Sequence, residues 1–239
     1  MGTWSPLVSQ PHHALAFGAL WATLEWPEDG PFPPDVLTQR YERSSKMVGV
    51  LPTGTGQGER RQLAFFWSLR EDQFEAWQRG GLKLWKQEVE RLWPETAILL
   101  SQITDPAQLT FARYAHRTVK APAADRMIHL GDSWHSASPQ LGQGANMALL
   151  DAFALSVALE HSATVDDALT RAVRLRRRHV QLYQALTWMF TPVYQSESRI
   201  IPFFRDRLVA PLSRIPALTK LQAAMVSGLV GSPLAALGL

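Results

Sequence analysis

Apolar residues in the first half of the chain follow strand-like patterns. Aromatic and aliphatic residues dominate three segments, which predicts strands over residues 14–25, 47–51 and 63–69. The glycine-rich segment 52–58 separates the last two and predicts a turn between them. Alternation returns over residues 109–119 and predicts another strand, whereas residues 36–41 predict a short helix. We therefore expect a three- or four-stranded, largely antiparallel sheet.

Helical spacing takes over further along the chain. Apolar residues recur every three or four positions from residue 74 to residue 92 and predict a helix that ends before Pro94. A short strand leads into Gly131-Asp132, and a glycine-rich loop and an apolar helix over residues 146–160 follow it. Beyond residue 165 the pattern predicts only helices, broken by prolines at positions 192, 202, 211 and 216. The expected fold class is α+β, with a β-rich segment (1–125), a strand–loop–helix unit (126–162) and a helical C-terminal tail (163–239).

Composition narrows the class of protein. Of the 239 residues, 46% are hydrophobic and 19% are charged, which is typical of a soluble globular protein with a core. The chain has no cysteine, which excludes disulfides, cysteine-ligated metals and thiol nucleophiles. Its seven histidines include no H-x-x-x-H pair, so we expect no metal site.

Charge and terminal segments bear on partners and location. A formal net charge of +3 is too small to predict a nucleic-acid partner. The uncharged tail Leu221–Leu239 is interrupted by glycines and Pro233, which predicts a packed or surface-associated segment in peripheral contact with a membrane rather than a spanning helix. The N-terminus lacks the pattern of a secretory signal, and we expect a cytoplasmic protein. One basic cluster predicts a solvated helix face, at Arg171, Arg174, Arg176, Arg177 and Arg178.

Residues 131–146 carry the most informative chemistry. Asp132 follows a short strand, where its carboxylate can accept hydrogen bonds from the hydroxyls of a ligand. Gly142 and Gly144 have no side chains, so their backbone amides can approach a flat ligand closely. These amides open a helix, whose N-terminus favours anionic ligand atoms.

The same run resembles the second FAD-binding motif of the single-component (class A) flavoprotein monooxygenases, which include the aromatic hydroxylases and the ubiquinone-biosynthesis hydroxylases. The motif has the form G-D-x-x-H-x-x-x-P-x-x-G-Q-G-x-N. All eight fixed positions match, at Gly131, Asp132, His135, Pro139, Gly142, Gln143, Gly144 and Asn146. Ala148 and Asp151-Ala152 also fit the way the helix continues in that group.

The resemblance implies a cofactor, a reaction and roles for individual residues. It implies FAD, with NAD(P)H as reductant and O2 as co-substrate, and the hydroxylation of a small aromatic or apolar substrate. Residues 1–125 would then form the substrate-covering domain. Asp132 would bind the ribityl hydroxyls, Pro139 would lie beside the isoalloxazine ring, and His135 is a weak candidate for proton transfer next to a structural role. The implied cofactor-binding residues are Gly131, Asp132, Pro139, Gly142, Gln143, Gly144, Ala145 and Asn146.

One part of the family pattern is absent from the sequence. The family begins with a βαβ unit carrying G-x-G-x-x-G, which cradles the FAD pyrophosphate, whereas Gly54-Thr55-Gly56-Gln57-Gly58 has another spacing and leads into a predicted strand. We therefore expect the C-terminal part of such an enzyme. Three explanations stay open: the gene is truncated, the open reading frame starts late, or a separate chain or a homodimer supplies the other half of the FAD site. Whether the chain is itself an enzyme is left open.

Two alternatives remain beside this interpretation. The chain could be a non-catalytic fragment, or a module that binds a ligand or a partner and derives from a flavin monooxygenase. A GDS-type esterase is a minor alternative, because Gly131-Asp132-Ser133 is similar to the nucleophile block of that family. The sequence has no later Asp-x-x-His pair and no G-x-S-x-G motif, which disfavours a hydrolase.

Overall fold

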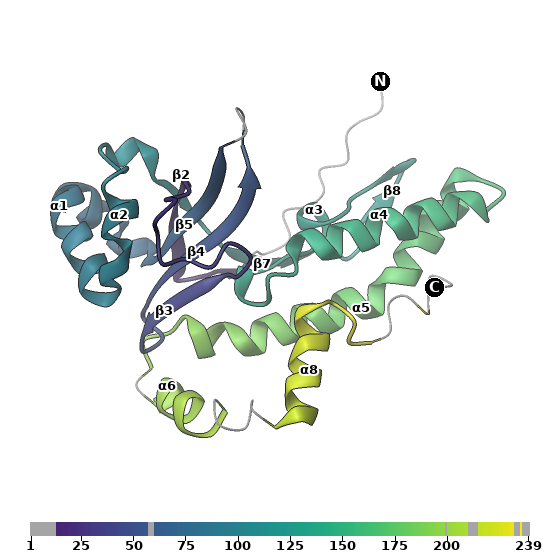
Figure 1. Cartoon of the computed structure of the whole chain (residues 1–239). Coiled ribbons are helices and arrows are strands. Elements are labelled where there is room, and N and C mark those ends of the chain that lie inside the picture. Colours follow the sequence, from purple (N-terminus) through teal and green to yellow (C-terminus); the bar gives the residue numbers. More distant parts are fainter. Residues whose placement is uncertain (1–12, 57–59, 199, 210–214, 232–234, 236–239) are drawn as a thin grey trace. The chain divides into compact units, whose positions relative to one another are not determined.

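The computed structural model describes residues 13–56, 60–198, 200–209, 215–231 and 235. These residues group into two compact units. The first, which we call the sheet unit, contains Leu15–Tyr114 and Tyr194–Pro202. The second, the helical unit, contains Ala115–Val193 with the described residues of 13–14 and of 203–235 (Figure 1). The predicted boundaries near residues 125 and 162 stay predictions.

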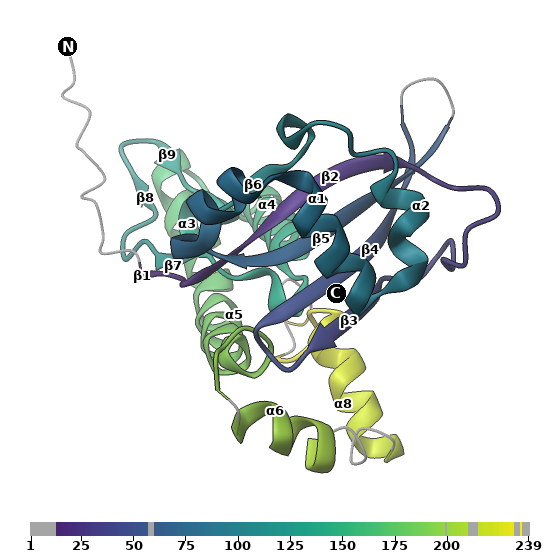
Figure 2. The ribbon, with the colours of Figure 1, turned by 90° about the vertical axis from the view of Figure 1, so that its left-hand side faces the viewer.

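The sheet unit is built on a five-stranded antiparallel sheet (Figure 2). Its strands lie in the order β3-β4-β5-β2-β6. The long central strands pair in continuous register, with Leu20 opposite Trp67 and Ala22 opposite Phe65. The bounds are β2 (Phe17–Glu25), β3 (Thr38–Glu42), β4 (Lys46–Thr55), β5 (Arg61–Arg70) and β6 (Thr110–Ala112).

The short helix predicted over residues 36–41 is wrong. Thr38–Glu42 forms the edge strand β3, in which Arg40 pairs with Val48 of β4. Val36 and Leu37, which suggested an apolar helix face, are 48% and 47% exposed. Pairing with β4 therefore decides the conformation of this segment, in spite of its weak helical pattern. The sheet has five strands rather than the expected three or four.

Helices cover one face of this sheet and bury its core. Leu20, Phe65 and Trp67 point to that face and pack against Trp85 and Val89 of α1. The predicted helix over residues 74–92 is confirmed as α1, although Gly81 departs from helical geometry inside it. The bounds are η1 (Glu71–Gln73), α1 (Phe74–Leu92), η2 (Pro94–Thr96), α2 (Ala97–Leu100) and η3 (Pro106–Gln108).

The helical unit begins with two short strand pairs. β1 (His13–Ala14) pairs with β7 (Ala115–Thr118), so that His13 lies opposite His116. The chain between these strands forms the body of the sheet unit. β8 (Ala123–Ala124) pairs with β9 (Met127–Ile128), which leads towards Gly131.

The remaining elements are helical, as the sequence predicts. α4 and α5 pack closely through small side chains, since Ala158 meets Ala168 and Ala172 in a buried cluster. α5 continues past Pro192, where we expected a break, and ends at Tyr194. Pro216 starts α8, while Pro211 lies outside the described residues. The bounds are α3 (Asp132–His135), η4 (Pro139–Leu141), α4 (Gly144–Glu160), α5 (Val165–Tyr194), α6 (Ile200–Phe204), the π-helix η5 (Arg205–Val209) and α8 (Pro216–Val226).

Across the described part of the chain, every helix is too short or too polar to cross a membrane. The tail predicted to lie at a surface, Leu221–Leu239, is described only for residues 221–231 and 235.

Candidate functional site

The site forms where the turn at Gly131 meets the start of α4. Gly131 adopts a positive φ of 54°, and a Cβ on it would lie only 2.9 Å from the Cβ of Ala148. The absence of a side chain therefore lets the turn lie against α4. Asp132 follows at the start of α3 with its side chain exposed. Its Oδ1 lies 3.9 Å from the place that a Cβ would occupy on Gly144.

The loop before α4 ends in a left-handed residue. Gly142 terminates η4 with a φ of 63°, and α4 begins two residues later at Gly144. Pro139, Gly142, Gly144 and Ala145 are exposed. The structure therefore brings the carboxylate of Asp132 next to an exposed, nearly side-chain-free helix start.

This helix start carries unpaired partial positive charge. The first amides of a helix have no partner inside the helix and together with the peptide dipoles are equivalent to about half a positive charge. Among the described residues, no side chain caps the N-terminus of α4. These donors are therefore available to an anionic or strongly polar ligand edge.

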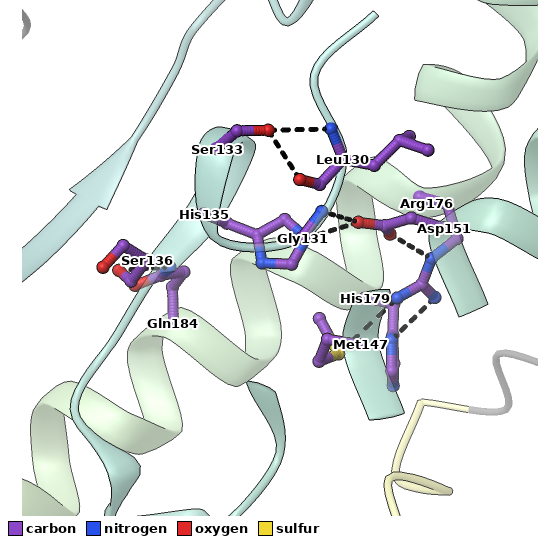
Figure 3. A network of polar contacts seen from close by, with 10 residues as sticks. All are labelled: Leu130, Gly131, Ser133, His135, Ser136, Met147, Asp151, Arg176, His179 and Gln184. Carbon is purple, nitrogen blue, oxygen red and sulfur yellow. Dashed lines mark hydrogen bonds and ion pairs between the residues drawn. The ribbon is translucent and has the colours of Figure 1, made fainter. Parts of the chain in front are cut away.

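A buried carboxylate, that of Asp151, is hydrogen-bonded to the turn at Gly131 (Figure 3). Asp151 of α4, only 1% exposed, accepts hydrogen bonds from three donors. Its Oδ2 accepts from the backbone amide of Gly131 (2.9 Å) and from Nε2 of His135 (2.7 Å), and its Oδ1 accepts from Nε of Arg176 (2.8 Å). Burial alone would raise the pKa of Asp151, but the hydrogen bonds from His135, Gly131 and Arg176 outweigh it and the pKa is lowered.

The network continues through a second histidine. Nη1 of Arg176 donates to Nδ1 of His179 (2.8 Å), and Nε2 of His179 donates to the carbonyl oxygen of Gly228 (3.0 Å). Burial and the neighbouring charge of Arg176 lower the pKa of His179 to about 4. His179 is therefore neutral near pH 7 and adds no charge to the network.

His135 lies in this network rather than at the exposed loop. Its ring is 5% exposed and its Nε2 is engaged by Asp151. The arrangement supports the structural role that the sequence offered for it, because the ring fixes α3 to α4. Ser133, the nucleophile of the esterase alternative, donates its hydroxyl proton to the carbonyl oxygen of Leu130 (2.6 Å) and accepts from the Leu130 amide (3.1 Å).

Arg176 shows that the prediction of a wholly solvated arginine face is wrong. Arg174, Arg177 and Arg178 are exposed, but Arg176 is 1% exposed and paired with Asp151. The sequence contains a signal for this burial that we did not use. Position 176 lies on one helical stripe with four buried apolar residues of α5, Ala172, Val173, Val180 and Tyr183.

The side chains of Gln143 and Asn146 turn away from the exposed loop surface. Nε2 of Gln143 donates to the carbonyl oxygen of Val226, and Nδ2 of Asn146 donates to that of Ser227 (3.3 Å). Asn146 also donates to Oε1 of Gln143 (2.9 Å). Both residues can therefore serve a ligand through their backbone amides, while their side chains bind the end of α8.

The sheet unit has a separate hollow of about 430 Å³, lined in part by Trp21, Thr23 and Thr110. Nε1 of Trp21 donates to the hydroxyl of Tyr114 (2.8 Å), and its ring stacks on Phe66 at 4.6 Å between centroids. Side chains alternate along β2 and β5, so this aromatic pair lies on the face opposite the core against α1. The described residues contain no group of three or more His, Asp or Glu side chains that could hold a metal ion.

Comparison with known proteins places the chain among flavoproteins. The model of one protein family, described as "FAD binding domain", matches residues 23–215. A protein of Rhodococcus erythropolis, a probable 2-heptyl-3-hydroxy-4(1H)-quinolone synthase, is 30% identical over 94 residues, which make up 39% of this chain and 22% of that protein.

Solved structures share the fold at low sequence identity. PqsL of Pseudomonas aeruginosa, a probable FAD-dependent monooxygenase, superposes with a TM-score of 0.62 at 16% identity and covers 79% of this chain and 51% of its own. The tetrameric form of 2-methyl-3-hydroxypyridine-5-carboxylic acid oxygenase gives a TM-score of 0.64 at 17% identity and covers 94% and 54%. The chain thus spans about half the length of these proteins.

Proposed function

Since the chain belongs to the family of FAD-binding domains, we propose that it supplies the flavin-facing half of an FAD-dependent monooxygenase. The enzyme would hydroxylate a small aromatic or apolar substrate with NAD(P)H and O2. The observation that carries the proposal is the placement of Asp132 beside the uncapped, exposed start of α4 at Gly144. A cytoplasmic location stays a prediction.

The residues present fit the isoalloxazine and ribityl parts of FAD. The exposed carboxylate of Asp132 can accept hydrogen bonds from ribityl hydroxyls. The glycines at 142 and 144 leave room for a flat ring, and the α4 amides would be the donors to its electron-rich edge. The sequence contains no Gly-x-Gly-x-x-Gly for the adenine and pyrophosphate parts.

The chain's own residues would act by orientation and electrostatics. FAD, when bound, supplies the redox chemistry with NAD(P)H and O2. The N-terminus of α4 would stabilise negative charge on the ring edge, since its amides are fixed before the charge develops. Asp151, bonded to Gly131, His135 and Arg176, would hold the turn that presents Asp132.

The proposed substrate class rests on the sheet unit and on the relatives. The hollow beside Trp21 combines an indole ring with threonine hydroxyls, which suits a small, flat molecule with a few polar groups. The names of the Rhodococcus protein and of the pyridine oxygenase also contain heteroaromatic compounds. Phe65 and Trp67 are core residues and contribute nothing to this hollow.

The exposed apolar side chains of α4 indicate that a partner covers this helix in the proposed enzyme. Between Gly144 and Glu160 the only ionisable side chain is Asp151, and it points inward. Leu149, Phe153 and Leu159 are 71%, 39% and 49% exposed, so α4 is apolar on its outer side as well. A helix that is apolar all round is normally buried. We propose that a polypeptide carrying the nucleotide-cradling βαβ unit covers this face.

A flavin titration tests the proposal. We expect the purified chain to bind riboflavin about as tightly as FAD, because its contacts reach only the isoalloxazine and ribityl groups. Binding is measured by ligand-detected NMR, which registers weak complexes, and by flavin fluorescence. A folded chain with no affinity for either flavin would refute the proposed role of this loop. A homodimer in the native mass, together with slower amide hydrogen exchange of α4 than in the monomer, would show that a second copy, rather than a βαβ partner, covers α4.

Asp132→Ala tests the assigned ribityl contact. Loss of charge-assisted hydrogen bonds is worth about 1.5–3 kcal/mol each, so flavin affinity should fall at least tenfold while the melting temperature is retained. Asp166→Ala is the matched control, because Asp166 is also an exposed carboxylate in the first turn of a helix. Equal flavin affinity in both variants would remove Asp132 from the site.

A further inference from the structure

The C-terminal end of α8 is held by four side chains of the helical unit, each bonded to a different carbonyl of four consecutive residues. The last carbonyls of a helix have no partner in the regular helical pattern, and these four donors bind carbonyls at the end of α8 and in the turn that follows it. The bonds run from the Tyr183 hydroxyl to Met225 (3.0 Å), from Gln143 Nε2 to Val226, from Asn146 Nδ2 to Ser227 (3.3 Å) and from His179 Nε2 to Gly228 (3.0 Å).

Two of these four donors belong to the loop that opens α4. Gln143 and Asn146 flank the amides assigned above to the flavin, and they are also bonded to each other (2.9 Å). A third donor, His179, belongs to the network of Asp151 and Arg176. The motif is therefore held at both ends, by Asp151 at Gly131 and by the end of α8 at Gln143 and Asn146.

The geometry of this contact depends on a glycine. α8 ends in a Schellman motif, in which the amide of Leu229 donates to the carbonyl of Ala224 (2.9 Å) and that of Gly228 to Met225 (3.2 Å). Gly228 has the positive φ (76°) that this motif requires. A Cβ on Gly228 would overlap Nδ2 of Asn146 and would lie 2.7 Å from Oε1 of Gln143.

Little else attaches α8 to the described part of the unit. None of the residues of α8, Pro216–Val226, is buried. Leu221 and Val226 are 51% and 60% exposed. The carbonyls at its end, with Val230 packed on the core below, therefore make the main contact.

We propose that the turn Met225–Gly228 is a positioning element of the flavin site and that Gly228 is the residue on which it depends. By holding the side chains of Gln143 and Asn146, the turn keeps the backbone of residues 142–146 in the conformation that presents its amides. The inference rests on the proposed function for the ligand, but it also makes a statement about the loop without any ligand. The residues of the turn act through the loop and do not touch the flavin.

Gly228→Ala tests the proposal against a matched control. Gly231 also has a positive φ (88°), but a Cβ there would lie 3.0 Å from Leu182 and 3.7 Å from His179, the latter an ordinary van der Waals contact, and would not meet the loop. Alanine at either position brings similar backbone strain, and only the change at position 228 displaces Asn146. We expect Gly228→Ala to accelerate amide hydrogen exchange across residues 142–147 and to weaken riboflavin binding about tenfold, as the loss of one or two hydrogen bonds implies. Gly231→Ala should leave both quantities within twofold of wild type.

The two measurements test the positioning role of the turn Met225–Gly228 and the flavin assignment separately. Faster loop exchange in Gly228→Ala alone supports the positioning role even if no flavin binds, in which case only the proposed function fails. Unchanged exchange and unchanged flavin affinity in a folded Gly228→Ala protein overturn the inference. If that variant does not fold, Tyr183→Phe decides, since it removes one of the four bonds without adding atoms. This variant should accelerate amide hydrogen exchange of the loop and weaken riboflavin binding two- to fivefold. Wild-type values for both quantities would refute the positioning role of the turn.

Discussion

Replacement of Asp151 by asparagine should strongly destabilise the helical unit. An asparagine keeps the volume of Asp151 but has one acceptor oxygen where the carboxylate has two. At least one of the donors from Gly131, His135 and Arg176 would then lose its acceptor. Because Arg176 is 1% exposed, its guanidinium would be left buried beside a neutral group.

The magnitude follows from this burial. Removing one partner of a buried ion pair costs about 3–5 kcal/mol, against a typical total stability of about 5–15 kcal/mol. For a chain of this size each kcal/mol shifts the melting temperature by about 2–4 °C, so Asp151→Asn should lower it by roughly 6–20 °C. Differential scanning calorimetry of the purified variant measures this shift.

A matched control distinguishes burial from charge alone. Asp206 forms an ion pair with Arg205 at 2.7 Å, but its side chain is 61% exposed. Asp206→Asn should therefore change stability by less than about 0.5 kcal/mol. Asp151→Asn combined with Arg176→Met should be less destabilised than Asp151→Asn alone, because the uncompensated charge is gone. A melting temperature of Asp151→Asn equal to that of the control would refute this account of the network.

Two further changes follow from the same structure. Burial and the charge of Arg176 lower the pKa of His179 from its ordinary value of 6.5 to about 4 in the fold. The unfolded chain therefore binds more protons between these values, and stability should fall by up to about 3 kcal/mol as the pH drops from 6.5 to 4. Urea unfolding across this range measures the effect, and His179→Gln should flatten it. A Cβ on Gly49 would overlap the ring of Phe66, so Gly49→Ala should cost about 1–3 kcal/mol. Gly80→Ala in α1, where the space is open, should be neutral or stabilising, and equal chemical stability of the two variants would contradict the contact.

The elements that the sequence predicted correctly are those whose own pattern is strong. α1 has large apolar residues at positions 74, 77, 82, 85, 89 and 92, at spacings of three to five. In β5, residues 63–69 are apolar except Ser68, and most of them are buried. β3 was not predicted because none of its five residues is buried, so the edge strand lacks an apolar alternation, and only its pairing with β4 defines it.

For the candidate site, the sequence pointed to the loop that we propose for the flavin but not to the residues that support it. In the structure Asp132 lies beside Gly144, and Gly131 lies against Ala148. The burial of Arg176 was missed because its neighbours in the sequence are basic. The apolar residues at helical spacing around it indicate the burial. The bond from Gln143 to Val226 spans 83 positions and ends on a backbone carbonyl, which has no residue-type signature. Gly228 could have been noted, because a glycine within the last predicted helical stretch is a possible helix end.

The short pairing of β1 with β7 has a consequence for how this architecture can change. His13 and His116 lie opposite each other, so the chain leaves the helical unit and returns to it at almost the same point. The segment Leu15–Tyr114, which is the larger part of the sheet unit, is thus joined to the helical unit at two adjacent points, an arrangement that tolerates insertion and exchange of a segment. Evolution could therefore change or replace this segment, which is proposed to contact the substrate. The Asp151 network and the loop beside it would then be kept unchanged.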